Sequence, residues 1–277
     1  MFELFRSSNR QLMITTLTCV CLFCGALISC NGCPSGPAPG PFIYVADFGN
    51  STVTAYLTLA TGNAPPFKTY QGANTQLAGP TGIWVDLNRN LYVANQPSNS
   101  VTEYALSDGG NVTPIASIQG GATQLNGPRA IAVASGPRQP GNGNIFVANF
   151  NGNSVTVYSP TGSTNRAPIY TVSAGVSQPI GVAIIGIFLF VLNSAPPSIT
   201  SYTALGANGS SPIATITSSQ LQNPQGLGTD GLGWLYVSNF DGATNRAASE
   251  RMEATTISAC LFRNRHKVVA RLCWMSA

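Results

Sequence analysis

The chain has 277 residues, of which 44% are hydrophobic and only 8% are charged, and it contains 29 glycines and 19 prolines. Average soluble proteins carry about 25% charged residues, so this composition argues against a helical bundle and favours short strands and tight turns in one all-β domain. The formal charge is +4, but residues 41–240 hold five basic and five acidic side chains. Nucleic-acid binding requires clustered Lys and Arg, so we expect no nucleic-acid partner.

Residues 1–29 have the layout of an export signal. Arg6 and Arg10 precede an uncharged apolar run over residues 12–28, which is the order of a basic and an apolar region in a secretory signal. The run ends in residues 27–30 (LISC), which resemble the lipobox of bacterial lipoproteins. The resemblance implies cleavage before Cys30 and a lipid on its thiol, which would hold the protein at a membrane.

Residues 30–41 are predicted to form a tether, because they are small, rich in proline and glycine, and lack hydrophobic periodicity. We therefore expect an exported protein, lipid-anchored to a bacterial membrane and facing the periplasm or the cell surface. The sequence leaves open which membrane carries the anchor. The alternative is an ordinary cleaved signal, or an uncleaved helix, that contains cysteines.

One five-residue stretch recurs along residues 42–244. It combines an aliphatic residue, an aromatic ring, Val, a mostly small residue, and Asn or Asp. Its copies are 43–47 (IYVAD), 91–95 (LYVAN), 145–149 (IFVAN), 189–193 (LFVLN) and 235–239 (LYVSN). The aromatic positions 44, 92, 146, 190 and 236 lie 48, 54, 44 and 46 residues apart, which is a period typical of propellers and solenoids.

Two further residues keep a fixed distance from this stretch. In four copies a Tyr lies 12 residues after the aromatic ring, and a Pro lies 10 residues after that Tyr. The tyrosines are Tyr56, Tyr104, Tyr158 and Tyr202, and the prolines are Pro66, Pro114, Pro168 and Pro212. Turn residues followed by alternation, as in 154–158 (SVTVY), predict a β-hairpin. Proline cannot donate a ladder hydrogen bond, so the run after it is predicted to be the outermost strand.

A fourth element precedes the last four copies of the stretch. It begins near a proline and is rich in small residues, in the copies 79–86, 127–134, 178–185 and 223–230. Small residues suit an innermost strand, because backbones crowd together at the axis of a radial assembly. Four strands in about 45 residues form a propeller blade, so the predicted fold class is all-β, a β-propeller with about five blade motifs. The first motif lacks an innermost strand.

Two segments resemble known propeller families. Residues 80–86 (PTGIWVD) followed by 91–95 resemble NHL-repeat propellers, and residues 92–104 (YVANQPSNSVTEY) are similar to the YVTN-type repeats of lactonase-like propellers. The resemblance covers roughly residues 42–244. It implies a propeller fold and no particular ligand.

The repeat pattern stops after residue 244. Ala248 stands where a fifth Tyr is expected, and residues 245–277 hold six basic side chains. We interpret residues 245–277 as an anomalous basic tail, left by a frameshift or gene-end error that truncated a longer propeller. The alternative is a genuine appendage with a helix near residues 261–272, whose basic side chains would lie on lipid headgroups.

No residue pattern identifies a catalytic site. The only histidine is His266 in the tail, which excludes a Ser-His-Asp or Cys-His site in the repeats. The spacing of Cys260, His266 and Cys273 fits no usual zinc pattern. Carboxylates end two innermost strands, at Asp86 and Asp230, without forming a repeated acidic ring. We therefore predict no catalytic residue, no metal site and no cofactor.

The recurring Asn or Asp that ends each stretch is the remaining candidate. These residues are Asp47, Asn95, Asn149, Asn193 and Asn239. We predict a structural role, in which each side chain forms hydrogen bonds within its own turn. The alternative places some of them at a central metal, as in gluconolactonase-type propellers, but no such ligand set is matched here. Trp84 and Trp234 are expected to pack between blades.

The expected function is therefore binding. We expect a membrane-anchored, extracytoplasmic propeller that presents loops to an unknown protein or glycan. Two alternatives stay open: a lactonase-like hydrolase that uses a central metal, and a truncated product without independent function. Whether the protein is an enzyme is uncertain, and the fold resemblance alone supports either reading.

Overall fold

The computed structural model describes residues 42–134, 141–204, 208–229, 234–241, 246–253, 259–264 and 267–272, with only the backbone described from residue 241 onward. The chain divides into two compact units, Met1–Gly40 and Pro41–Ala277. The predicted export signal, Cys30 and the tether lie outside the described residues. Among the helices that the structure describes, none has the length and apolar character needed to cross a membrane.

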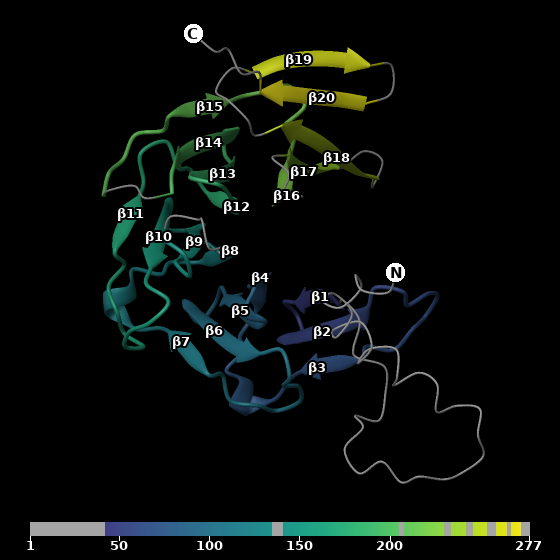
Figure 1. Cartoon of the computed structure of the whole chain (residues 1–277), viewed down its shortest axis with the longest axis vertical. Coiled ribbons are helices and arrows are strands. Elements are labelled where there is room, and N and C mark those ends of the chain that lie inside the picture. Colours follow the sequence, from purple (N-terminus) through teal and green to yellow (C-terminus); the bar gives the residue numbers. More distant parts are fainter. Residues whose placement is uncertain are drawn as a thin grey trace, which may run out of the picture. The chain divides into compact units, whose positions relative to one another are not determined.

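The described strands form five sheets that follow one another in sequence order (Figure 1). Blade 1 contains β1 (Phe42–Asp47), β2 (Thr52–Leu57) and β3 (Lys68–Tyr70). Blade 2 contains β4 (Pro80–Val85), β5 (Asn90–Asn95), β6 (Ser100–Ala105) and β7 (Ala116–Ile118). Blade 3 contains β8 (Pro128–Val133), β9 (Ile145–Asn149), β10 (Ser154–Tyr158) and β11 (Tyr170–Val172).

The remaining two sheets complete the series. Blade 4 contains β12 (Pro179–Ile185), β13 (Phe188–Ser194), β14 (Pro197–Thr203) and β15 (Ala214–Ile216). Blade 5 contains β16 (Pro224–Thr229), β17 (Trp234–Asp241), β18 (Arg246–Glu253), β19 (Ala259–Asn264) and β20 (Lys267–Leu272). Two short 3-10 turns, η1 (Ala73–Thr75) and η2 (Gly121–Thr123), precede blades 2 and 3.

The predicted strand roles are confirmed. Each innermost strand of blades 2 to 5 begins at the expected proline, and the recurring aromatic stretch is the second strand of every blade. Each outermost strand of blades 1 to 4 has three residues and begins two positions after its proline. The residue directly after that proline donates the first backbone hydrogen bond to the third strand, as from Ile115 N to Glu103 O at 2.8 Å.

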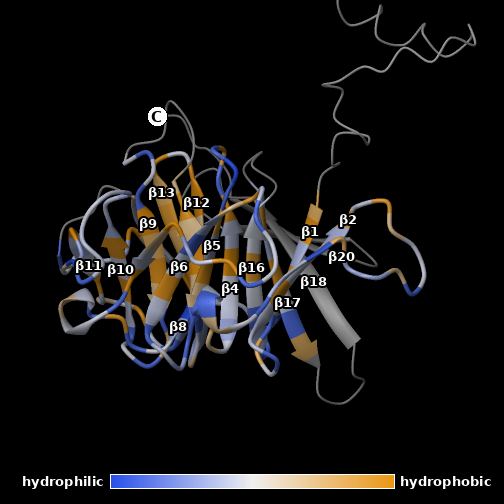
Figure 2. Cartoon of the chain, turned by 90° about the horizontal axis from the view of Figure 1, so that it is seen from below, coloured by the Kyte–Doolittle hydropathy of each residue, from blue (hydrophilic) through white to orange (hydrophobic). Residues whose placement is uncertain are grey.

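Apolar side chains fill the space between neighbouring blades. The innermost strands pack in series, β4 against β8, β8 against β12, and β12 against β16. Figure 2 shows hydrophobic residues, in orange, concentrated along strands such as β9, β12 and β13. Strands buried on both faces need apolar residues at consecutive positions, because each face packs against a different blade. This explains the apolar residues at consecutive positions in 181–184 and 189–192, which are all buried, whereas Gly186 and Ile187 between them are exposed.

The two ends of the series differ from its middle. Blade 1 has three strands, and among the described strands β1 pairs only with β2. Figure 1 shows blades 1 and 5 at the two ends of an arc, so the described sheets do not close into a ring. The predicted lack of an innermost strand in the first blade is therefore confirmed for the described part of the chain.

Residues beyond 244 take a strand conformation. Strand β18 pairs antiparallel with β17 in unbroken register, from Asp241 opposite Arg246 to Trp234 opposite Glu253, so the third strand of blade 5 is present where the sequence pattern is lost. The alternative of a helix over residues 261–272 is wrong, because β19 and β20 form an antiparallel hairpin there. The interpretation of residues 245–277 as a basic tail stays a prediction.

Candidate functional site

The innermost strands share an irregularity directly after their first residue. In blades 2 to 5 the register against the second strand shifts between a proline and a small residue: Pro80 and Gly82, Pro128 and Ala130, Pro179 and Gly181, Pro224 and Gly226. One residue per blade is left without a partner across the ladder. These four residues, named the bulge ring here, are Thr81, Arg129, Ile180 and Gln225. Bulges re-aim side chains and are common beside functional sites.

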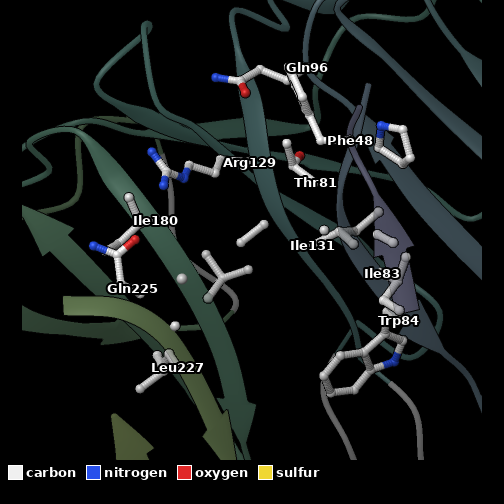
Figure 3. Close-up of a pocket in the computed structure, with 17 residues that line it drawn as sticks. Phe48, Thr81, Ile83, Trp84, Gln96, Arg129, Ile131, Ile180, Gln225 and Leu227 are labelled. Atoms are coloured by element: carbon white, nitrogen blue, oxygen red, sulfur yellow. The ribbon is translucent and has the colours of Figure 1, made fainter. Parts of the chain in front are cut away.

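All four bulge-ring residues line one cavity of about 680 Å³ between the innermost strands. Gln96 and Phe48, from the hairpin turns of blades 2 and 1, also line it. Figure 3 shows Gln96, Arg129 and Thr81 toward one end of the cavity and Trp84 toward the other. The volume is in the range of small-molecule and peptide pockets. We call this space the axial cavity.

Arg129 is the only charged residue among the described lining residues. Its guanidinium lies over the ring of Phe150, 5.0 Å from the ring centre, a contact that fixes the side chain but leaves its N–H groups free to donate. The single hydroxyl hydrogen of Thr81 can be donated to the carbonyl oxygen of Pro128, at 3.0 Å, or to that of Ala94, at 3.3 Å, and the hydroxyl oxygen retains its capacity to accept. The polar end of the cavity can therefore hold an anionic or hydrogen-bonding group.

The walls of the axial cavity are apolar and tightly packed. Ile83, Ile131 and Leu227 line them. A Cβ at Gly82 would lie 2.8 Å from the Cα of Ala130, so only a residue without a side chain lets β4 approach β8 this closely. Trp84 packs against buried residues between blades, as expected, and its indole Nε1 is buried with no hydrogen-bond partner among the described residues.

The asparagines at the ends of the second strands link different parts of a blade. Asn149 is fully buried; its Oδ1 accepts from the Asn126 N–H at 3.0 Å, and its Nδ2 donates to Thr156 Oγ1 at 2.9 Å. Asn95 and Asn193 make the same two kinds of bond, to the loop before the innermost strand and to the third strand. We predicted bonds within their own turns, but these bonds join three segments of the blade.

Asp47 and Asn239 depart from this arrangement. Asp47 does bond within its own turn, accepting from the backbone N–H of Asn50 at 3.1 Å and from its Nδ2 at 2.7 Å, and these bonds lower the pKa of Asp47. The structure describes no loop before β1 that Asp47 could bind. Asn239 donates through Nδ2 to Gln220 O at 3.0 Å, while its buried Oδ1 has no partner among the described residues. None of the five side chains lines the axial cavity.

The carboxylate of Asp86 closes the turn after β4. Its Oδ1 accepts from the Asn90 N–H at 2.7 Å, and its Oδ2 accepts from the Tyr92 hydroxyl at 3.5 Å. Nearby, Glu103 accepts from Asn90 Nδ2 at 2.8 Å, and burial raises its pKa. These bonds give Asp86 and Glu103 structural partners. Asp230 and His266 lie outside the described residues.

Sequence reasoning did not identify the residues that line the axial cavity. Thr81, Arg129 and Gln225 sit between a constant proline and a constant small residue. The usable signal was therefore the variable position directly after the proline of each innermost strand. Phe48 and Gln96 follow the recurring Asn or Asp directly, and their role depends on how the turns of two blades meet.

Comparisons with known proteins support the fold. No family model matches the sequence, and no curated protein matches it. The chain is similar in structure to the WD40 β-propeller domain of Doa1, with 12% identity and a TM-score of 0.51 over 78% of this chain and 67% of that chain. It is also similar to Raptor of Chaetomium thermophilum, with 8% identity and a TM-score of 0.54 over 74% of this chain and only 18% of that chain. Together with the four-stranded sheets, these likenesses establish a β-propeller fold, whereas the NHL or YVTN type of its repeats stays a prediction.

Proposed function

We propose that this protein is a binding module that holds a protein partner at the polar end of the axial cavity. We further propose that it is exported and anchored to a bacterial membrane through a lipid on Cys30. The proposal for the anchor rests on the sequence of residues 1–30, and the proposal for binding rests on the bulge ring.

The bulge ring carries the binding proposal. The residue before it is proline in all four blades and the residue after it is glycine or alanine, as the fold requires. At this one position the four blades carry a hydroxyl, a guanidinium, an aliphatic chain and an amide, although the backbone has the same bulge in each blade. The fold therefore requires no single residue type between the proline and the small residue. The variation at this position leaves these side chains available for recognition.

Several features favour a protein over a glycan as the partner. Phe48 lines the cavity and is 52% exposed, and Arg129 lies near the same end. Aromatic residues and arginine supply much of the binding energy of protein interfaces. Propellers of the WD40 class, which this fold resembles, commonly serve as protein-interaction modules. The described lining residues include no carboxylate, histidine or cysteine, so no observation favours the metal-dependent hydrolase.

A position-specific crosslinking experiment tests the binding site. A photoreactive amino acid would replace Thr81, Arg129 or Gln225 in the full chain, and Leu59 or Leu87 in control variants, because these leucines are 90% and 72% exposed outside the cavity. In cells that naturally make the protein, the three bulge-ring positions should capture one common protein. Equal capture from the leucine positions, or capture of glycan alone, would overturn the proposal.

The anchor is tested separately. Cys30→Ser should abolish incorporation of labelled fatty acid and release the protein from the membrane fraction, because the thiol is the expected attachment point. Cys33→Ser, three residues away, is the matched control and should remain lipidated. Labelling that survives in Cys30→Ser would contradict the assignment.

A further inference from the structure

One face of the first strand of blade 1 is exposed, whereas the same face of the other second strands is buried. Ile43 is 52% exposed and Val45 is 44% exposed. Their equivalents in the other second strands are at most 1% exposed: Leu91, Val93, Ile145, Val147, Leu189, Val191, Leu235 and Val237. The five stretches have nearly the same sequence, so the exposure of β1 results from its surroundings.

The backbone of β1 also has an open hydrogen-bonding edge. In blade 2 the N–H of Asp86 donates to the carbonyl oxygen of Asn90. Because every second residue of an antiparallel strand bonds to the same neighbour, the backbone N–H and C=O groups of Tyr92 and Ala94 also point toward β4. Tyr44 and Ala46 are the equivalent residues of β1. Among the described strands β1 pairs only with β2, so the N–H and C=O groups of these two residues face an edge that no described strand occupies.

Tyr44 shows a second difference. Its hydroxyl is buried without a hydrogen-bond partner among the described residues. The equivalent Tyr92 donates to Asp86, the residue that directly follows the innermost strand of blade 2. A hydrogen-bond acceptor at the end of an added strand would bind the Tyr44 hydroxyl as Asp86 binds the Tyr92 hydroxyl.

Space beside this edge opens onto the axial cavity. Ala46 and Phe48 of blade 1 and residues 80–84 of β4 line that cavity together. In the other blades an innermost strand fills the corresponding place, and β4 packs directly against β8. The cavity therefore includes room next to β1 on the side where its pairing partner would lie.

We propose that the free edge of β1 accepts an extended segment of a protein partner, which pairs antiparallel with β1 and completes blade 1 as its innermost strand. Strand addition to an open sheet edge is a general mode of peptide recognition. The inference rests on the proposed function in one respect, that the partner is a protein, and it names the part of the partner that binds.

The four filled blades define the chemistry of this segment. Their innermost strands share the order proline, any residue, glycine or alanine, and an aliphatic residue. In blades 2, 3 and 5 the small residue pairs with a small residue of the second strand, as Gly82 does with Ala94, whereas in blade 4 Gly181 pairs with Leu192. A Cβ at Gly181 would lie 2.6 Å from Leu227 Cβ. The partner segment must therefore be small opposite Ala46 and aliphatic opposite Val45, with an acceptor such as Asp at its end for Tyr44.

Synthetic peptides test this inference without knowledge of the partner. The probe is a fluorescein-labelled peptide of residues 79–87 (GPTGIWVDL), the chain's own innermost strand of blade 2, added to the purified full chain in detergent micelles. Fluorescence anisotropy should show saturable binding. The same peptide with Gly82→Val should bind at least about tenfold more weakly, and so should a scrambled peptide of equal composition.

Variants of the protein test the same edge. Ala46→Pro removes an edge-facing N–H and should weaken binding of the peptide much more than Ala46→Ser, which keeps that N–H. Thermal unfolding compares the two variants, and if Ala46→Pro does not fold, the peptide series alone decides. Absence of peptide binding, or binding indifferent to Gly82→Val, would overturn the inference. If crosslinks from the bulge ring persisted in that case, the proposed function would stand, so the two failures are distinguishable.

Discussion

Blades 1 and 3 place almost the same five residues in very different environments. The second strand of blade 3, residues 145–149 (IFVAN), is buried throughout, whereas in residues 43–47 (IYVAD) of blade 1 Ile43 and Val45 are exposed and the other three are partly buried. Strand conformation is the same in both. The neighbouring strand and the neighbouring blade therefore decide whether these side chains are buried. The apolar sequence of the strand permits burial but does not cause it.

Neighbouring segments also decide whether the polar side chain at the end of the second strand is buried. Asn149 is buried because a loop before β8 and a third strand offer it partners on two sides. Asp47 occupies the equivalent place in blade 1, remains partly exposed and bonds to its own turn. A carboxylate is tolerated at this position because it keeps its contact with water, whereas an unpaired buried charge would be costly.

The largest expected effect compares Ile145→Ala with Ile43→Ala. Ile145 is 1% exposed and Ile43 is 52% exposed. Removing the buried side chain should lower the free energy of unfolding by about 2–5 kcal/mol, because it leaves a cavity. The equivalent change in blade 1 should cost about 1 kcal/mol or less. Chemical denaturation of both variants measures the difference, and equal losses would show that blade 1 is buried in solution.

A smaller effect is expected from adding a methyl group to an innermost strand. A Cβ at Gly181 would lie 2.6 Å from Leu227 Cβ, whereas a Cβ at Gly228 would meet nothing within 4 Å. Gly181→Ala should therefore destabilise the fold by about 1–3 kcal/mol through overpacking. Gly228→Ala, in β16, should stay within about 0.5 kcal/mol of the parent. Thermal unfolding of the two variants measures the loss of stability, and it tests whether that loss depends on contact with the neighbouring blade or only on the position within an innermost strand.

The asparagine position gives the next comparison. Asn149→Ala should lower the free energy of unfolding by about 1–3 kcal/mol, since it leaves the part-buried N–H of Asn126 and the hydroxyl of buried Thr156 without their partner. Asp47→Ala removes bonds within one exposed turn and should cost clearly less. Denaturation midpoints of the two variants provide the measurement. A loss for Asp47→Ala as large as that for Asn149→Ala would contradict the difference between the blades.

The smallest effect is a change in pH dependence. Burial raises the pKa of Glu103, at a third-strand position where blades 1 and 3 have Ala55 and Val157. Ionising Glu103 costs more in the folded chain than in the unfolded chain, so its contribution to stability falls as pH rises above about 4.3 toward the raised pKa. Glu103→Gln should therefore be more stable than the parent at pH 7, with the difference shrinking toward pH 4.

Asp47 should show the opposite slope. Its pKa is lowered by the bonds from Asn50, so its stabilising contribution is present above the usual aspartate pKa and is lost as pH falls through the lowered value. Denaturant titrations of Asp47→Asn, Glu103→Gln and the parent between pH 3 and pH 8 compare the sign of the pH dependence of the stability difference for the two variants. Parallel slopes for the two variants would refute the assignment of burial as the cause at Glu103.

The repeat allowed a large part of the fold to be predicted. Fixed offsets from the aromatic ring assigned the strands correctly, because hydrophobic alternation, turn residues and proline act locally. The helix over residues 261–272 was wrong, since short apolar runs are compatible with either helix or strand and the hairpin of β19 and β20 decides between them. The hydrogen bonds of Asn149 were also not predictable, because its partners lie 23 residues before it and 7 after it.

The sequence by itself determined that this protein is built from propeller blades, and it determined the role of each described strand and that the first blade, in the described part of the chain, begins without an innermost strand. These features depend on periodicity and on the backbone limits of proline and glycine. The tertiary structure alone decided which copies are buried, that Arg129 and Gln225 meet Thr81 around one cavity, and that β1 has an open edge. Those outcomes depend on contacts between segments far apart in the chain, which no single repeat encodes.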